Sequence, residues 1–240
     1  MAGPQYRYYS LLTAGFVTVL LCSNLIGPGK VCQIDFPFVL PLIGASLVFG
    51  AGNIFFPISY IFGDILTEVY GYARARKVIW AGFGAMIFAT VMSQVIINLP
   101  PSPAEPFNNV LQPALETVFG STWRIVVASI LAFWIGDFIN AYVMARMKVW
   151  TAGRHLWART IGSTILGQGV DSLVFYPIAF YGIWSSGSLL TVLMFNFVFK
   201  VMIEVIMTPA TYVVIGALKR AEAEDFYDKD TDFTPFSLKD

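Results

Sequence analysis

Long apolar stretches separated by short polar segments make up most of the chain. Six of them carry few or no charges and approach the ~20 residues that an α-helix needs to cross a bilayer. We predict these helices at residues 10–26, 53–69, 78–99, 123–145, 161–183 and 189–218. The predicted fold class is an all-α integral membrane protein with about six transmembrane helices.

The stretch before the second predicted helix does not fit this pattern. Residues 36–62 are apolar but are interrupted by prolines and glycines, at Pro37, Pro41, Gly44, Gly50, Gly52 and Pro57. The stretch is too long for one straight helix and too broken for two. We predict a re-entrant or interfacial segment at about residues 38–49, because irregular backbone survives at membrane depth only where protein or a water-filled cavity shields it.

Charge is scarce and unevenly placed. Only 12% of the 240 residues are Asp, Glu, Lys or Arg, against ~25% in soluble domains, and eleven of these thirty lie between Lys219 and Asp240. The remainder cannot cover a water-facing surface, which excludes a soluble globular protein. Zero net charge without a basic face also excludes nucleic acid as a partner. We predict a single polytopic membrane domain at residues 1–218 and an acidic, frayed cytoplasmic tail at residues 219–240.

The distribution of Lys and Arg predicts the orientation, because cytoplasmic loops are enriched in both. Placing both termini in the cytoplasm assigns twelve of the fifteen basic residues to that side. They are Arg7, Arg74, Arg76, Lys77, Arg146, Lys148, Arg154, Arg159, Lys219, Arg220, Lys229 and Lys239. The loop at residues 100–122 carries only two glutamates and is predicted to face outside.

Several predicted helices carry polar side chains that are expensive in a membrane, at least ~2.5–3.5 kcal/mol for a charge at its centre. They recur three or four residues apart, so each group lies on one helix face. The groups are Asp64 with Glu68, Asp137 with Asn140, Gln168 with Asp171, and Asn196, Lys200 and Glu204. We predict one shared polar interior that accepts a cationic or donor-rich ligand, or that holds protons.

Simpler interpretations of these residues stay open. Lys200 is predicted to pair with Glu204 or Asp171 as a structural or gating ion pair, and Glu68 could pair with Arg74 or Arg76 near the basic loop. Aromatic residues such as Tyr60 are interleaved with the polar positions. A few of them beside carboxylates would suit a flat heterocyclic substrate.

Motifs of catalysis are not found in the sequence. There is no phosphate-binding loop of the ATPase type, no Gly-x-Ser-x-Gly, and a single histidine, His155, in a basic loop. Cys22 and Cys32 form neither a metal motif nor a disulfide framework. We therefore predict no enzymatic activity, no catalytic residues, no metal and no cofactor.

One run at the second predicted helix is specific: Phe56-Pro57-Ile58-Ser59-Tyr60-Ile61-Phe62-Gly63-Asp64-Ile65-Leu66-Thr67-Glu68-Val69-Tyr70-Gly71-Tyr72-Ala73-Arg74-Ala75-Arg76. It resembles the signature of the queuosine precursor transporter family, also called the putative vitamin uptake transporter family. Weaker similarities are Ser23-Asn24 with Lys30, Gln168-Gly169-Val170-Asp171-Ser172 and Phe199-Lys200-Val201. Together they cover about residues 10–218, although the apolar stretch at 37–52 is expanded.

The resemblance implies an inner-membrane importer of queuosine precursors, which are 7-deazaguanine-type bases. Such a base offers N–H donors that one carboxylate accepts together. Asp64 and Asp171 are the expected ligand contacts, and both lie in runs that carry the resemblance. The full predicted substrate-binding set is Asp64, Asp171, Asp137, Asn140, Gln168, Glu68, Tyr60 and Asn24.

Three mechanisms remain open at this point. The chain could transport its substrate alone, or it could be the substrate-capture subunit of a transporter energised by a separate ATPase and coupling partner. An intramembrane enzyme using the aspartates is a third. The predicted partners are a small heterocyclic substrate and the lipid bilayer, with a homo-oligomer or an ATPase and coupling partner as further options.

Overall fold

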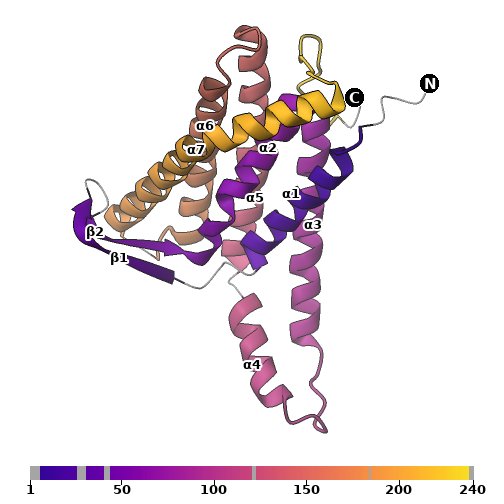
Figure 1. Cartoon of the computed structure of the whole chain (residues 1–240). Helices are drawn as coiled ribbons and strands as arrows, with labels where there is room; N and C mark the ends of the chain where they lie inside the picture. Colours follow the sequence, from indigo (N-terminus) through magenta and orange to yellow (C-terminus); the bar gives the residue numbers. More distant parts are fainter. Residues whose placement is uncertain (1–5, 26–30, 41–43, 121–122, 184, 238–240) are drawn as a thin grey trace.

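The computed structural model describes residues 6–25, 31–40, 44–120, 123–183 and 185–237, which form a helical bundle with one hairpin (Figure 1). In chain order the elements are α1 (Tyr9–Leu25), β1 (Val31–Leu40), β2 (Gly44–Gly50), the 3-10 helix η1 (Ala51–Ile54), α2 (Phe56–Tyr70), α3 (Tyr72–Asn98), α4 (Asn108–Phe119), α5 (Trp123–Trp150), α6 (Leu156–Phe180) and α7 (Ser186–Glu222).

Each of the six predicted membrane helices coincides with a helix of the structure: α1, α2, α3, α5, α6 and α7. Three of the described helices, α3, α5 and α7, are long and apolar enough to cross a membrane, and α1 is a shorter apolar helix. The mostly helical membrane protein is therefore confirmed, whereas the number of spans stays a prediction. The helices α5 and α7 run further than predicted, to Trp150 and Glu222.

The segment before α2, where a re-entrant or interfacial piece was predicted, departs from the mostly helical pattern. It forms an antiparallel hairpin in which β1 pairs with β2, from Val31 opposite Gly50 to Leu40 opposite Gly44. Valine, isoleucine and phenylalanine favour extended backbone here, and pairing lets the two segments satisfy each other's N–H and C=O groups. The register is irregular between Asp35 and Leu40, where Pro37 lacks an N–H to donate.

The loop predicted to face outside contains an unpredicted helix, α4. It lies next to the far end of α3, away from the body of the bundle (Figure 1). Gln112 Nε2 donates to the carbonyl oxygen of Ile97 at 2.9 Å, and Gln94 Nε2 donates to that of Phe119 at 2.9 Å. These hydrogen bonds from side-chain amides attach α4 to α3, and α4 has no buried residue of its own.

Helices α5 and α6 approach each other closely through two glycines. A Cβ at Gly167 would lie 2.8 Å from the Cβ of Asn140, and one at Gly136 would lie 3.0 Å from the Cβ of Asp171. Any larger residue at either position would push the helices apart. The close approach fixes the relative placement of Asn140 and Asp171, which belong to the polar interior.

The described part of the tail is folded onto the bundle, so the prediction of a frayed extension is wrong. Phe226 N–H donates to the carbonyl oxygen of Val69 at 3.3 Å. Further along, Arg76 Nη1 donates to the carbonyl oxygen of Asp232 at 2.7 Å, and Trp80 Nε1 to that of Pro235 at 2.8 Å. The tail carries aromatic residues between its acidic ones, and the aromatic side chains pack against the bundle although the composition of the tail is acidic.

The two ends of the described chain meet at the same end of the bundle (Figure 1). Arg7 N–H donates to Glu222 Oε2 at 2.9 Å, and Tyr6 Oη donates to Glu224 Oε2 at 2.8 Å. The guanidinium of Arg74 lies over the Tyr6 ring, 4.6 Å from its centre. Arg7 and Arg74, which were both assigned to the cytoplasmic side, thus lie at the same end of the bundle.

Candidate functional site

Asp64 lies in the middle of the bundle on α2 and is fully buried. Its Oδ1 accepts a hydrogen bond from Asn140 Nδ2 of α5 at 3.3 Å. Among the described residues, Asp64 Oδ2 and Asn140 Oδ1 have no hydrogen-bond partner. Two buried oxygen acceptors from neighbouring helices are therefore available to a ligand with N–H donors.

Gln168 of α6 connects three helices. Its Oε1 accepts hydrogen bonds from Tyr60 Oη of α2 at 2.8 Å and from Lys200 Nζ of α7 at 3.0 Å. Lys200 Nζ also donates to Asp171 Oδ2 at 2.8 Å, which makes an ion pair. The structure thus places Lys200 on Asp171, one of its two predicted partners.

A small cavity lies next to these side chains. It is close to the smallest space that one water molecule occupies. Three predicted site residues, Tyr60, Asp137 and Asn140, line it. The other lining residues come from α1, α2, α3 and α5 and are mostly apolar: Phe16, Ser59, Gly63, Leu66, Thr67, Ala75, Val78, Ile79 and Ala141.

Glu204 lies one helical turn after Lys200 on α7 and is also fully buried. Neither of its carboxylate oxygens accepts a hydrogen bond within the described ranges. The predicted pairing of Lys200 with Glu204 is therefore not made as a hydrogen bond, because Lys200 reaches towards α6 instead. Glu204 is left as a buried carboxylate without a donor.

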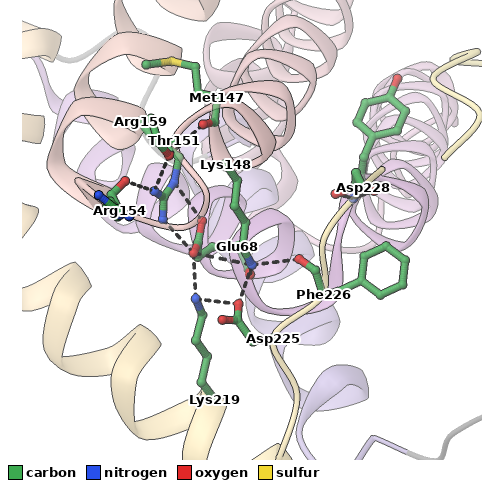
Figure 2. Close-up of polar contacts among 11 residues, drawn as sticks. Glu68, Met147, Lys148, Thr151, Arg154, Arg159, Lys219, Asp225, Phe226 and Asp228 are labelled. Atoms are coloured by element: carbon green, nitrogen blue, oxygen red, sulfur yellow. Dashed lines mark hydrogen bonds and ion pairs between the residues drawn. The ribbon is translucent and has the colours of Figure 1, made fainter. Parts of the chain in front are cut away.

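Glu68, four residues after Asp64, belongs to a different environment (Figure 2). Its Oε1 accepts from Arg159 Nη2 at 2.8 Å and from Lys219 Nζ at 2.7 Å, and its Oε2 accepts from Arg159 Nε at 3.2 Å. Lys148 Nζ lies 3.5 Å from Oε1. We call Glu68, Lys148, Arg159, Lys219 and Asp225 the charged cluster; it replaces the predicted pairing with Arg74 or Arg76.

The tail completes the charged cluster. Lys148 Nζ donates to Asp225 Oδ1 at 2.5 Å and to the carbonyl oxygen of Phe226 at 2.7 Å (Figure 2). Lys219 pairs with the same Asp225 oxygen at 2.7 Å. Burial alone would raise the pKa of Asp225, but the bonds from Lys148 and Lys219 outweigh it and hold the pKa below its ordinary value.

Sequence reasoning assigned Lys148 and Arg159 to basic loops and missed their place in this cluster. A signal existed for Lys148, because no glycine or proline interrupts the chain from Ala141 to Trp150 and the helix was free to continue. Ala141, Ala145 and Lys148 then fall on one face, and all three are buried. No comparable signal pointed to Asp225, which reaches the cluster only through tertiary folding of the tail.

Asn24 does not join either group through the contacts that the structure describes. Its Nδ2 donates to the carbonyl oxygen of Leu20 at 2.9 Å and to Ser23 Oγ at 3.0 Å, both within α1. Within the described ranges, no three His, Cys, Asp or Glu side chains form a group that could hold a metal ion. The polar interior is thus built from Tyr60 and Asp64 of α2 and from residues of α5, α6 and α7.

A bundle of apolar helices around buried carboxylates is typical of a membrane protein with a polar interior. The sequence matches the family described as Putative vitamin uptake transporter over residues 50–214, and the chain belongs to that family. The family consists of transporters, which confirms the predicted family and the prediction that the chain is not an enzyme.

Curated relatives agree with this assignment. The chain is 31% identical to the "Probable queuosine precursor transporter" of Bacillus subtilis over 199 residues, covering 82% of this chain and 80% of the relative. It is 26% identical to the "Queuosine precursor transporter" of Escherichia coli over 177 residues, covering 72% and 75%. No solved structure matches the chain.

Proposed function

We propose that this protein imports queuosine precursors, 7-deazaguanine-type bases, across the bacterial plasma membrane. Family membership supports transport, and the names of the relatives support this substrate class. The observation that carries the proposal is the pair of buried acceptors, Asp64 Oδ2 and Asn140 Oδ1, which have no donor among the described residues. A guanine-like edge presents an N1–H and a 2-amino group, which match two acceptors.

Asp171 is the second proposed ligand contact. In the structure its Oδ2 is held by Lys200, while Asp137 lies near enough to both groups to interact with their charges. A precursor that carries an aminomethyl group would bring its own cation to this pair of aspartates. Binding would then replace part of the interaction between Asp171 and Lys200.

The small cavity lined by Tyr60, Asp137 and Asn140 is smaller than a purine-sized base, so the ligand requires the helices to separate. Transporters bind in one conformation and release in another, and the structure would correspond to a closed state. Asp64 on α2 and Asn140 on α5 belong to different helices, so relative movement of these helices would open or close the site.

Binding by the purified protein tests the proposal. A panel of purines and 7-deazapurines should show selective binding of the 7-deazaguanine-type bases. Asp64→Asn or Asp171→Asn replaces an acceptor oxygen with a donor facing a donor, and should weaken binding at least ~tenfold, or ~1.4 kcal/mol. Glu116→Gln, an exposed change on α4, is the control and should bind normally. Undiminished binding in both Asp variants would remove these residues from the site.

Reconstitution separates the self-sufficient importer from the substrate-capture subunit. We expect the purified chain in liposomes to take up the ligand without any ATPase. Binding without uptake would favour the ATPase-dependent design.

Topology is tested by labelling single cysteines in a chain that lacks Cys22 and Cys32. We propose six spans with both termini in the cytoplasm, supported by the gathering of basic residues at one end of the bundle. A cysteine at Ser102 should react from outside and one at Trp150 only from inside, and both positions are exposed. Reaction of both from the same side would contradict the six-span topology.

A further inference from the structure

Lys200 holds the carboxylate that a cationic substrate would need. Its Nζ donates to Asp171 Oδ2 at 2.8 Å and to Gln168 Oε1 at 3.0 Å, and both acceptors lie on α6. The side chain of Lys200 is 10% exposed and that of Asp171 is 20% exposed, so the ion pair is largely withdrawn from water. Asp171 therefore already has a cation within the protein, and this cation is an ammonium group attached to α7.

The surroundings of Lys200 offer its ammonium group more than one acceptor. Gln168 Oε1 accepts from Lys200 and also from Tyr60 Oη of α2 at 2.8 Å, so this oxygen is held in place from two sides. From α5, the charge of Asp137 acts on both Asp171 and Lys200. A Lys200 side chain that leaves Asp171 can therefore keep its bond to Gln168, which lowers the cost of the displacement.

An aminomethyl group on a 7-deazaguanine carries the same chemical group as the end of a lysine side chain. Both end in an ammonium ion with three N–H donors, and carboxylate oxygens bind both in the same way. Two ammonium ions within a few ångströms repel each other, most strongly where water is scarce. A cationic base therefore has to displace Lys200 from Asp171, whereas a neutral base of the same shape leaves the ion pair intact.

We propose that Lys200 is a specificity-determining residue: it competes with the ammonium group of a cationic base for Asp171, and by returning to Asp171 it promotes release of that base. The inference rests on the proposed function, because that function places the aminomethyl group at Asp171. Asp171 keeps a cation throughout, so no buried carboxylate is stranded when the base leaves. The competition lowers the affinity, which suits a site that has to release what it binds.

The test compares two bases of one shape: 7-deazaguanine with an aminomethyl group at position 7, and its analogue with an ethyl group there, in which a methyl replaces the ammonium. Binding is measured at pH 8, where carboxylates are ionised and ammonium groups are protonated. Lys200→Met removes the competitor. The purified variant should bind the aminomethyl base at least about tenfold more tightly than wild type, the effect of one hydrogen bond to a charged group.

The ethyl analogue should bind wild type and Lys200→Met about equally, because it does not compete for Asp171. Lys229→Met removes an exposed lysine of the tail and is the matched control, which should equal wild type for both bases. Dissociation of the aminomethyl base should be slower from Lys200→Met than from wild type, since affinity differences of this kind lie mostly in the dissociation rate. A merely structural role of Lys200 would change binding of the two bases alike.

Two double variants locate the cation of the ligand. Adding Asp171→Asn to Lys200→Met should remove the gain for the aminomethyl base, whereas adding Asp137→Asn should preserve it. Lys200→Met with Asp171→Asn leaves neither charge of the pair stranded, so it also serves if Lys200→Met alone yields too little protein. This double variant should bind the aminomethyl base no more tightly than the ethyl analogue, and tighter binding of the aminomethyl base would overturn the proposal.

The outcomes separate this inference from the proposed substrate. If wild type binds neither base, the proposed substrate is wrong and the competition fails with it. If wild type binds both bases and Lys200→Met leaves the ratio of their affinities unchanged, only the role of Lys200 is overturned. A selective gain for the aminomethyl base that disappears with Asp171→Asn would support both.

Discussion

Glu68 and Glu204 are both fully buried glutamates in one helical bundle, yet their surroundings are opposite. Glu68 accepts hydrogen bonds from Arg159 and Lys219 and has Lys148 close by. Glu204 accepts none from the described residues. Removing a carboxylate from water is costly in both places, but only Glu68 recovers that cost in the folded protein.

The contrast separates structural from functional charge. A carboxylate surrounded by cations from three other helices fixes α2 against α5, α6 and α7, and both of its oxygens already accept hydrogen bonds. A carboxylate that accepts no hydrogen bond from the described residues, such as that of Glu204, is available to a proton or a ligand. Asp64 lies between these two extremes, because only one of its oxygens accepts a hydrogen bond from the part of the chain that the structure describes.

The largest effect is expected for Glu68→Gln, because it removes the anion that the buried Lys148 and Arg159 and the partly buried Lys219 contact. Breaking a buried ion pair from one side typically costs ~3–5 kcal/mol. We expect strongly reduced abundance in membranes and a lower melting temperature in detergent. Glu204→Gln is the matched control and should keep normal abundance. Equal abundance of the two variants would contradict the claim that Glu68 stabilises the fold and Glu204 does not.

A smaller loss is expected for Lys200→Met, which leaves Asp171 without its ion pair. Asp171 retains 20% exposure of its side chain, so water compensates it in part and the cost should stay below the ~3–5 kcal/mol of a fully buried pair. Adding Asp171→Asn should restore part of the lost abundance, whereas adding Glu204→Gln should not. Normal abundance of Lys200→Met with abolished binding would give Lys200 a direct ligand role.

Closure of the charged cluster by the tail depends on Gly71. This residue has φ +83, where side chains other than glycine are strained, and a Cβ there would overlap the Phe226 ring. Gly71→Ala should displace the tail from Lys148 and destabilise the fold by ~1–3 kcal/mol. Gly84→Ala on α3 meets nothing within 4 Å and should be tolerated. Thermal unfolding and limited proteolysis of the tail would be measured for both variants. If the tail of Gly71→Ala is cleaved no faster than that of Gly84→Ala, the tail does not depend on Gly71 for its placement.

The sequence allowed prediction of most helices but not of their partners. Apolar length located α1, α2, α3, α5, α6 and α7, because membrane helices need about twenty apolar residues. The hairpin at 31–50 was missed because proline and glycine interrupt helices and hairpins alike, and periodicity alone cannot distinguish them. The tail was missed because acidic composition dominated its pattern, whereas Phe226 and the residues after it provide packing.

In the candidate site, too, the helix faces could be predicted but the contacts between helices could not. Helical spacing grouped the polar residues by helix face, because spacing of three or four residues is a property of the helix itself. Hydrogen bonds join Asn140 to Asp64 and Lys200 to Gln168 across helices. Which side chain bonds to which depends on the rotation of each helix. Lys200 therefore reaches Asp171 rather than Glu204, and Glu68 meets cations from the ends of three helices.

The smallest expected effect concerns pH and the tail. The pKa of Asp225 lies below its ordinary value, so its stabilising contribution is present above the unfolded pKa of ~3.9 and is lost as pH falls through the folded pKa. Burial raises the pKa of Asp228, so its contribution has the opposite sign: it is present below ~3.9 and lost as pH rises through the folded pKa.

Melting temperatures of wild type, Asp225→Asn and Asp228→Asn across pH would measure the two contributions. The difference between wild type and Asp225→Asn should be constant from about pH 8 to pH 5, start to shrink near the unfolded pKa of ~3.9 and vanish only below the folded pKa, which is lower still. It should correspond to less than ~1 kcal/mol, because the Asp225 side chain is 44% exposed. The melting temperature of Asp228→Asn should rise relative to that of wild type as pH rises. A difference for Asp225→Asn that persists in strong acid would show that its role is packing rather than charge, unlike that of Glu68.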